Sequence, residues 1–94
     1  YVDDFIIGLE QLLHSANNAK GEIINLSSGE NLTLREMIEI CKSSLNSISQ
    51  INYGAIPYRT NEMMDLRCSM IKFSEITNYH INCDIRQRLK LMLE

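Results

Sequence analysis

An arginine and a glutamate lie three residues apart in a segment rich in turn-forming residues, Gly54–Met64 (GAIPYRTNEMM). Arg59 carries a planar guanidinium with five donors, which suits the paired oxygens of phosphate groups. The Glu62 carboxylate can accept hydrogen bonds from two neighbouring hydroxyls, such as those of a ribose. In an extended chain the two side chains would project to opposite faces, whereas a turn, which Asn61 favours, would bring them together. The residues alone favour a surface ion pair over a ligand site.

Other residues that could do chemistry lack the partners that a reaction centre needs. The glycines are too scattered for a phosphate-binding loop, and no tyrosine is followed four residues later by lysine. His14 and His80 have no cysteine or carboxylate at a spacing typical of a nucleophile or a metal site. Asp3 and Asp4 are better explained as a solvated acid beside a helix cap than as a catalytic pair. We therefore expect no catalytic residue, no metal site and no cofactor-binding residue in this chain.

Composition and charge narrow the possible partners. Nine basic and twelve acidic residues give a net charge of −3, and no basic stripe with interleaved aromatics is visible, which argues against nucleic-acid binding. The hydrophobic fraction of 45% is typical of a folded chain, and the apolar runs are too short for a membrane span. Cys41, Cys68 and Cys83 match no zinc spacing and suit a reduced, cytoplasmic setting as packing or surface thiols.

Local signals predict an alternation of helices and strands. Residues 33–36 (TLRE) have the pattern of a capping box and are followed by apolar residues at helical spacing. Asp4, Ser69 and Asp84 are expected to cap three further helices. The predicted order is helix–strand–helix–strand–helix–helix, which is an α/β pattern.

The two predicted strands are Glu22–Glu30 (EIINLSSGE) and Gln50–Ile56 (QINYGAI), the second ending before Pro57. Two strands cannot make a self-sufficient parallel sheet. The chain also begins with Tyr1 rather than methionine. We therefore expect it to be part of a larger protein.

Three runs of the chain resemble, in order and spacing, the C-terminal third of the extended short-chain dehydrogenases/reductases: YVDDFIIGLEQLL, GEIINLSSGENLTLREMIEICK and INYGAIPYRTNEMMD. This family contains the NAD(P)-dependent nucleotide-sugar epimerases, dehydratases and ketoreductases. The GAIPYRTNEMM run looks closest to the CDP- or dTDP-sugar reductases, such as abequose and paratose synthases. The family's usual aspartate and tryptophan near the last helices are replaced here by Ser69 and Tyr79.

The resemblance implies a C-terminal fragment of a Rossmann-type enzyme. Residues 1–28 would correspond to a returning helix and strand of the Rossmann lobe, 29–68 to part of the substrate-binding lobe, and 69–94 to the C-terminal helices. By the same resemblance, Arg59 would bind the diphosphate of a nucleoside-diphosphate sugar and Glu62 its ribose.

The family's dinucleotide-binding glycines and catalytic Tyr-x-x-x-Lys pair lie upstream of the matching region. The resemblance thus implies NAD or NADP in the complete protein, none bound by this chain alone, and no oxidoreductase or isomerase activity in the isolated 94 residues. Expected partners are a nucleoside-diphosphate sugar, the missing N-terminal Rossmann portion and a second copy in a homodimer. The alternative function is a non-catalytic small α/β module that binds nucleotide sugars or a protein.

Overall fold

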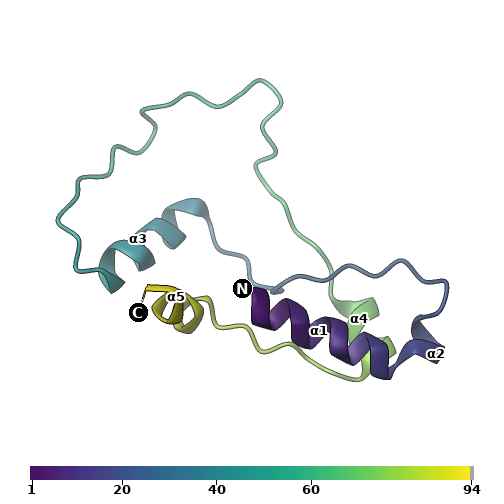
Figure 1. Cartoon of the computed structure of the whole chain (residues 1–94). Helices are drawn as coiled ribbons and strands as arrows, with labels where there is room; N and C mark the ends of the chain where they lie inside the picture. Colours follow the sequence, from purple (N-terminus) through teal and green to yellow (C-terminus); the bar gives the residue numbers. More distant parts are fainter. Residues whose placement is uncertain (94) are drawn as a thin grey trace. The chain divides into compact units, whose positions relative to one another are not determined.

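The structure of the protein is a computed structural model that describes residues 1–93. These residues form five helices (Figure 1): α1 Val2–His14, α2 Ala16–Ala19, α3 Leu34–Ser44, α4 Ile71–Thr77 and α5 Ile85–Leu93. Four of them occupy the places where the sequence predicts helices. The fifth, α2, is a single turn that follows α1 directly.

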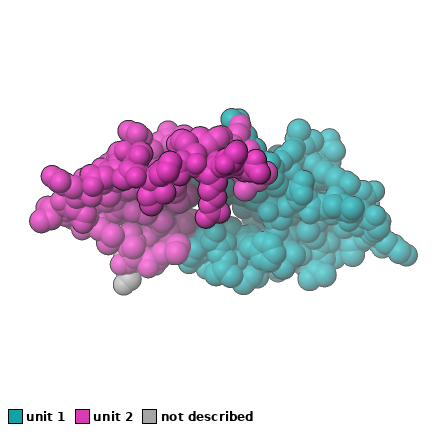
Figure 2. Space-filling view, turned by 90° about the horizontal axis from the view of Figure 1, so that it is seen from above, with its two compact units in different colours: residues 1–30, 67–84 teal, residues 31–66, 85–94 magenta. Residues whose placement is uncertain are grey.

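The chain forms two compact units, which Figure 2 shows in different colours. Unit 1 comprises Tyr1–Glu30 and Arg67–Asp84, so it contains α1, α2 and α4. Unit 2 comprises Asn31–Leu66 and the segment that begins at Ile85, so it contains α3 and α5. Each unit is built from two stretches that are distant in sequence. The division into residues 1–28, 29–68 and 69–94 stays a prediction.

The first helix begins earlier than its sequence suggests. Its N-cap is Tyr1, whose side chain makes no capping hydrogen bond, and Asp4 lies inside the first turn. The prediction that Asp4 caps this helix is therefore wrong. Asp4 is only 7% exposed, and it accepts a hydrogen bond from the thiol of Cys83. An acid in the first turn also interacts favourably with the partly positive helix N-terminus.

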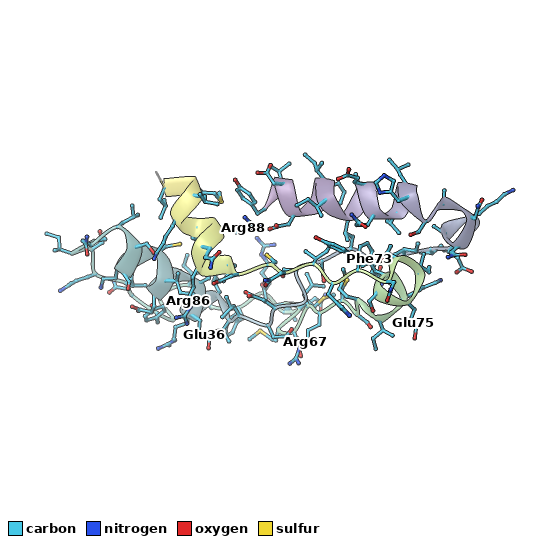
Figure 3. The ribbon with its side chains drawn as sticks, turned by 90° about the horizontal axis from the view of Figure 1, so that it is seen from below. Glu36, Arg67, Phe73, Glu75, Arg86 and Arg88 are labelled. Atoms are coloured by element: carbon cyan, nitrogen blue, oxygen red, sulfur yellow. The ribbon has the colours of Figure 1, made fainter. Side chains whose placement is uncertain are left out.

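Unit 1 is held together around α4. This helix packs against α1 and α2, and its Phe73 (Figure 3) is 1% exposed, the one buried hydrophobic side chain among the described residues. Gly8 on α1 is also buried, because Leu26 and Ile81 lie directly over it. A Cβ atom at Gly8 would be 2.7 Å from Leu26 Cδ1 and 3.1 Å from Ile81 Cδ1. The absence of a side chain at Gly8 thus lets the segment after α2 lie against α1.

Neither predicted strand forms in residues 1–93. Among the described residues, the backbone from 23 to 32 makes no hydrogen bond with another part of the backbone. The Ser27 amide instead donates to the sulfur of Met70 at 3.1 Å, although a thioether is a weak acceptor. The second segment contains a turn at Tyr53 and Gly54. A strand needs a neighbour to pair with its amides and carbonyls, and the described chain supplies none. The α/β fold class accordingly stays a prediction.

Unit 2 contains the helix that the sequence specifies best. Thr33 caps α3: its hydroxyl accepts from the Glu36 amide at 3.2 Å, and its own amide donates to Glu36 Oε2 at 2.7 Å. The predicted capping box is therefore confirmed. α3 packs against α5, which begins at Ile85 directly after the predicted cap, Asp84.

The N-cap of α4 is Met70, one residue after the expected Ser69. The Ser69 hydroxyl still accepts a long hydrogen bond, at 3.4 Å, from the Ile71 amide. At the other end, Asn78 adopts a left-handed conformation (φ 52°) and stops the helix. The predicted cap is thus displaced by one position, while its hydroxyl keeps part of its expected role.

Many large apolar side chains lie on the surface of the described residues. Ile23, Ile48 and Leu66 are each more than 80% exposed. None of the helices formed by residues 1–93 combines the length and the apolar character that crossing a bilayer requires. The exposed apolar groups are what a partner or a further domain would cover, and the expected homodimer stays a prediction.

Replacing Gly8 should loosen unit 1. We expect Gly8→Val to lower the free energy of unfolding by about 1–3 kcal/mol, because its methyl groups must displace Leu26 and Ile81. Urea unfolding followed by circular dichroism measures the change. Leu13→Val, at a position that is 75% exposed on the same helix, is the matched control and should have little effect. Equal midpoints for Gly8→Val and the unaltered chain would contradict the close packing at this glycine.

Candidate functional site

The two residues singled out by the sequence lie at the ends of a turn. The Glu62 amide donates to the carbonyl oxygen of Arg59 at 3.1 Å, which is the hydrogen bond that closes a four-residue β-turn. Thr60 and Asn61 are its central residues. The turn that Asn61 favours is therefore present, and Arg59 and Glu62 are not held on opposite faces of an extended strand.

Both side chains face solvent. Arg59 and Glu62 are exposed, and neither makes an ion pair or a side-chain hydrogen bond with another described residue. The surface ion pair that composition favours is thus not formed between them. A guanidinium and a carboxylate on one short turn are open to a ligand that offers phosphate oxygens and hydroxyls. Their assignment as substrate-binding residues stays a prediction.

The capping box at the N-terminus of α3, the helix that precedes this segment, contains a negatively charged side chain. The Thr33 amide and hydroxyl both donate to the Glu36 carboxylate and lower its pKa, and the nearby positive charge of Arg86 (Figure 3) acts in the same direction. The ionised carboxylate lies close to the free amides of the first turn. The folded capping box therefore favours the charged form of Glu36.

A separate pocket of about 370 Å³ lies within unit 1. Its lining comes from three short stretches, residues 27–29, 68–74 and 79–81. The hydroxyls of Ser27 and Ser28 accept hydrogen bonds from the amides of Gly29 and Glu30, so they stabilise the local backbone. Sequence reasoning did not single out this pocket, because no local spacing connects stretches so far apart. Apolar Phe73 and Ile81 line it beside His80, and nothing in this lining suggests a particular reaction.

The cysteines do not form a reactive centre in unit 1 or unit 2. All three are free thiols of intermediate exposure. Burial raises the pKa of the Cys83 thiol, and its hydrogen bond to the negatively charged Asp4 raises it further. A raised pKa keeps this thiol protonated and weakens it as a nucleophile. Within residues 1–93 no group of three or more His, Cys, Asp or Glu side chains is arranged to hold a metal ion.

Comparison with known proteins supports part of the sequence resemblance. The chain is 34% identical over 65 residues to CDP-abequose synthase of Salmonella muenchen, a match that covers 69% of this chain and 22% of that protein. The chain thus spans about a fifth of the length of this relative. No family model and no solved structure matches the chain. The likeness supports a relationship between this region and nucleotide-sugar enzymes.

Because of the capping box, the fraction of chains in which α3 is helical should depend on pH. The pKa of Glu36 is lower in the folded chain than the ordinary glutamate value of about 4.5, so the contribution of Glu36 to the stability of α3 is complete above about pH 4.5. It should be lost as the pH falls through the lower, folded-state pKa. We expect the helical circular dichroism signal to decrease in this range, and Glu36→Gln, which cannot titrate, to remove that part of the decrease.

Glu10→Gln provides the control for a simple change of charge, since Glu10 is an exposed acid on α1. It should leave the acid transition of α3 intact. An identical pH profile for Glu36→Gln and the unaltered chain would show that the capping box does not govern this helix.

Proposed function

We propose that this chain is the substrate-binding C-terminal portion of an NAD(P)-dependent nucleotide-sugar enzyme of the extended short-chain dehydrogenase/reductase type. The observation that carries the proposal is the 34% identity to a protein named for the synthesis of a CDP-sugar. In this proposal the ligand is a nucleoside-diphosphate sugar. Arg59 binds its diphosphate, and Glu62 accepts hydrogen bonds from the hydroxyls of its ribose.

The turn at residues 59–62 supports this assignment. A backbone hydrogen bond fixes the spacing of Arg59 and Glu62, and both side chains are exposed. The guanidinium can bind two oxygens of one phosphate group in parallel, which a lysine cannot do. Binding of this kind holds the sugar in place and leaves bond breaking to groups elsewhere in the protein.

The residues of this chain do not fit a dinucleotide cofactor. Gly21, Gly29 and Gly54 have positive φ angles, but they lie far apart in the sequence, Gly21 and Gly54 in separate turns and Gly29 in an irregular segment. A dinucleotide site needs closely spaced glycines that lead from a strand into a helix N-terminus. We therefore place NAD or NADP in the remainder of the enzyme and assign no cofactor contact to this chain.

The same proposal accounts for the unpaired segment after α2. We propose that residues 22–30 become a strand when the Rossmann portion of the enzyme supplies a neighbouring strand. The backbone from 23 to 32, which has no backbone partner within the described residues, is then available for pairing. In this arrangement the α/β fold is completed by the N-terminal part of the enzyme.

The proposed diphosphate contact can be tested with CDP as the probe. We expect Arg59→Ala to weaken CDP binding by about 10- to 100-fold, because a hydrogen bond to a charged group contributes about 1.5–3 kcal/mol. Arg59→Lys should fall between Arg59→Ala and the unaltered chain, since it keeps the charge and loses the two-pronged contact. Isothermal titration calorimetry gives the dissociation constants.

Lys20→Ala is the matched control, because it removes one exposed positive charge from unit 1. It should leave the dissociation constant for CDP almost unchanged. Equal losses of CDP affinity in Lys20→Ala and Arg59→Ala would show that the effect comes from the change in net charge and not from a contact made by Arg59. Unchanged binding in Arg59→Ala would overturn the assignment of Arg59.

A further inference from the structure

Tyr53 contacts one face of α3 through both its aromatic ring and its hydroxyl. The guanidinium carbon of Arg35 lies 4.1 Å from the centre of the Tyr53 ring, within the range of a cation–π interaction. The Tyr53 hydroxyl donates a hydrogen bond to the carboxylate of Glu39. Arg35 and Glu39 are four residues apart on α3, so they lie on the same face of the helix. All three residues belong to unit 2.

The backbone around Tyr53 forms a turn of its own. The Ala55 amide donates to the Asn52 carbonyl at 3.4 Å, and Gly54 has φ 78°. A positive φ at the third residue is what a type II turn requires, and glycine adopts it without strain. Tyr53 is the second residue of this turn. The turn therefore fixes the backbone from which the side chain reaches α3.

The contact shortens the free chain that leads to Arg59. The segment from the end of α3 to the start of α4 contains no helix or strand (Figure 1). Arg59 lies about 14 residues beyond Leu45, the C-cap of α3, but only about 6 beyond Tyr53. The entropy lost on ordering a tether grows with 1.5 times the logarithm of its length. A tether of about 6 rather than about 14 residues thus favours the ordered segment roughly three- to fourfold.

We propose that Tyr53 is a positioning residue, which binds the base of the 46–66 segment to Arg35 and Glu39 and so presents the Arg59–Glu62 turn to a nucleoside diphosphate. This inference rests on the proposed function. It adds three residues that touch no ligand themselves but reduce the cost of ordering the segment that does. Tyr53 acts through the backbone of the segment that carries Arg59.

The charges around the phenol give the contact a defined pH range. The hydrogen bond to Glu39 raises the pKa of Tyr53, and the negative charge of Glu39 acts in the same direction, against the opposing charge of Arg35. The protonated phenol is the donor, so the contact is complete below the ordinary tyrosine pKa. It is lost as the pH rises through the raised, folded-state pKa.

Limited trypsin digestion tests the contact without any ligand. Trypsin can cut after Arg59, and it does so faster when the surrounding segment is less ordered. We expect cleavage at this bond to be three- to fourfold faster in Tyr53→Leu, with a smaller increase in Tyr53→Phe, which keeps the ring against Arg35. Cleavage after Lys20, in unit 1, is the internal reference and should not change.

Tyr58→Phe is the matched control for loss of a phenol. The Tyr58 side chain is 77% exposed, and its hydroxyl has no partner among the described residues. The Tyr58→Phe substitution should therefore leave the rate of trypsin cleavage after Arg59 unchanged. An alkaline absorbance titration of tyrosine gives a second readout. Tyr53→Phe should remove a phenol whose pKa lies above the ordinary tyrosine value.

CDP titration then tests the positioning role. We expect Tyr53→Leu to raise the dissociation constant for CDP three- to fourfold, less than the loss in Arg59→Ala. In the unaltered chain, CDP binding should weaken at alkaline pH over the range in which Tyr53 titrates. This alkaline decrease should be absent in Tyr53→Leu.

The outcomes separate the two proposals. Unchanged trypsin cleavage in Tyr53→Leu would overturn the contact itself, whatever the ligand data show. Faster cleavage with unchanged CDP affinity would overturn the positioning role and leave the proposed function standing. Absence of CDP binding by the unaltered chain would overturn the proposed function and the positioning role together, while the cleavage data would still decide whether Tyr53 orders the segment.

Discussion

A segment forms regular secondary structure only when its amides and carbonyls find hydrogen-bond partners in the protein, and this requirement governs much of the structure. The helices meet it within themselves, so α1 and α3–α5 form wherever local signals specify them. Residues 23–32 cannot meet it alone, and within the described chain a methionine sulfur is the acceptor for the Ser27 amide. The segments between helices therefore rely on short turns, side-chain acceptors and close packing.

This requirement also explains how far the sequence alone could predict the fold. The capping box at Thr33 and Glu36 uses residues three apart, so a local pattern contains all the information that the helix start needs. The same is true of the turn at Arg59–Glu62, which Asn61 favours. Strand pairing is different, because it depends on a second strand whose identity no local pattern reveals. A strand-like alternation such as that of Glu22–Glu30 therefore predicts a strand only where a second strand is present to pair with it.

Asp4 shows the same limit within a helix. An aspartate near the start of an apolar periodic run is typical of an N-cap, and the local pattern holds nothing against that interpretation. In the structure Asp4 lies buried inside the first turn and accepts a hydrogen bond from the thiol of Cys83, which lies at the far end of unit 1 in sequence. The sequence likewise predicts a strand at Tyr53, because no local pattern reveals the contacts that this residue makes with Arg35 and Glu39 of α3.

The candidate site differs from the fold in one important respect: its geometry is almost entirely local. The Arg59–Glu62 turn closes through its own backbone, and the turn before it closes between Asn52 and Ala55. Both turns lie in unit 2 together with α3, so neither requires a sheet in order to form. A segment built in this way keeps the spacing of its guanidinium and carboxylate although residues 23–32 have no backbone partner within the described chain. A turn therefore fixes the spacing of the Arg59 guanidinium and the Glu62 carboxylate over four residues, independently of any contact outside unit 2.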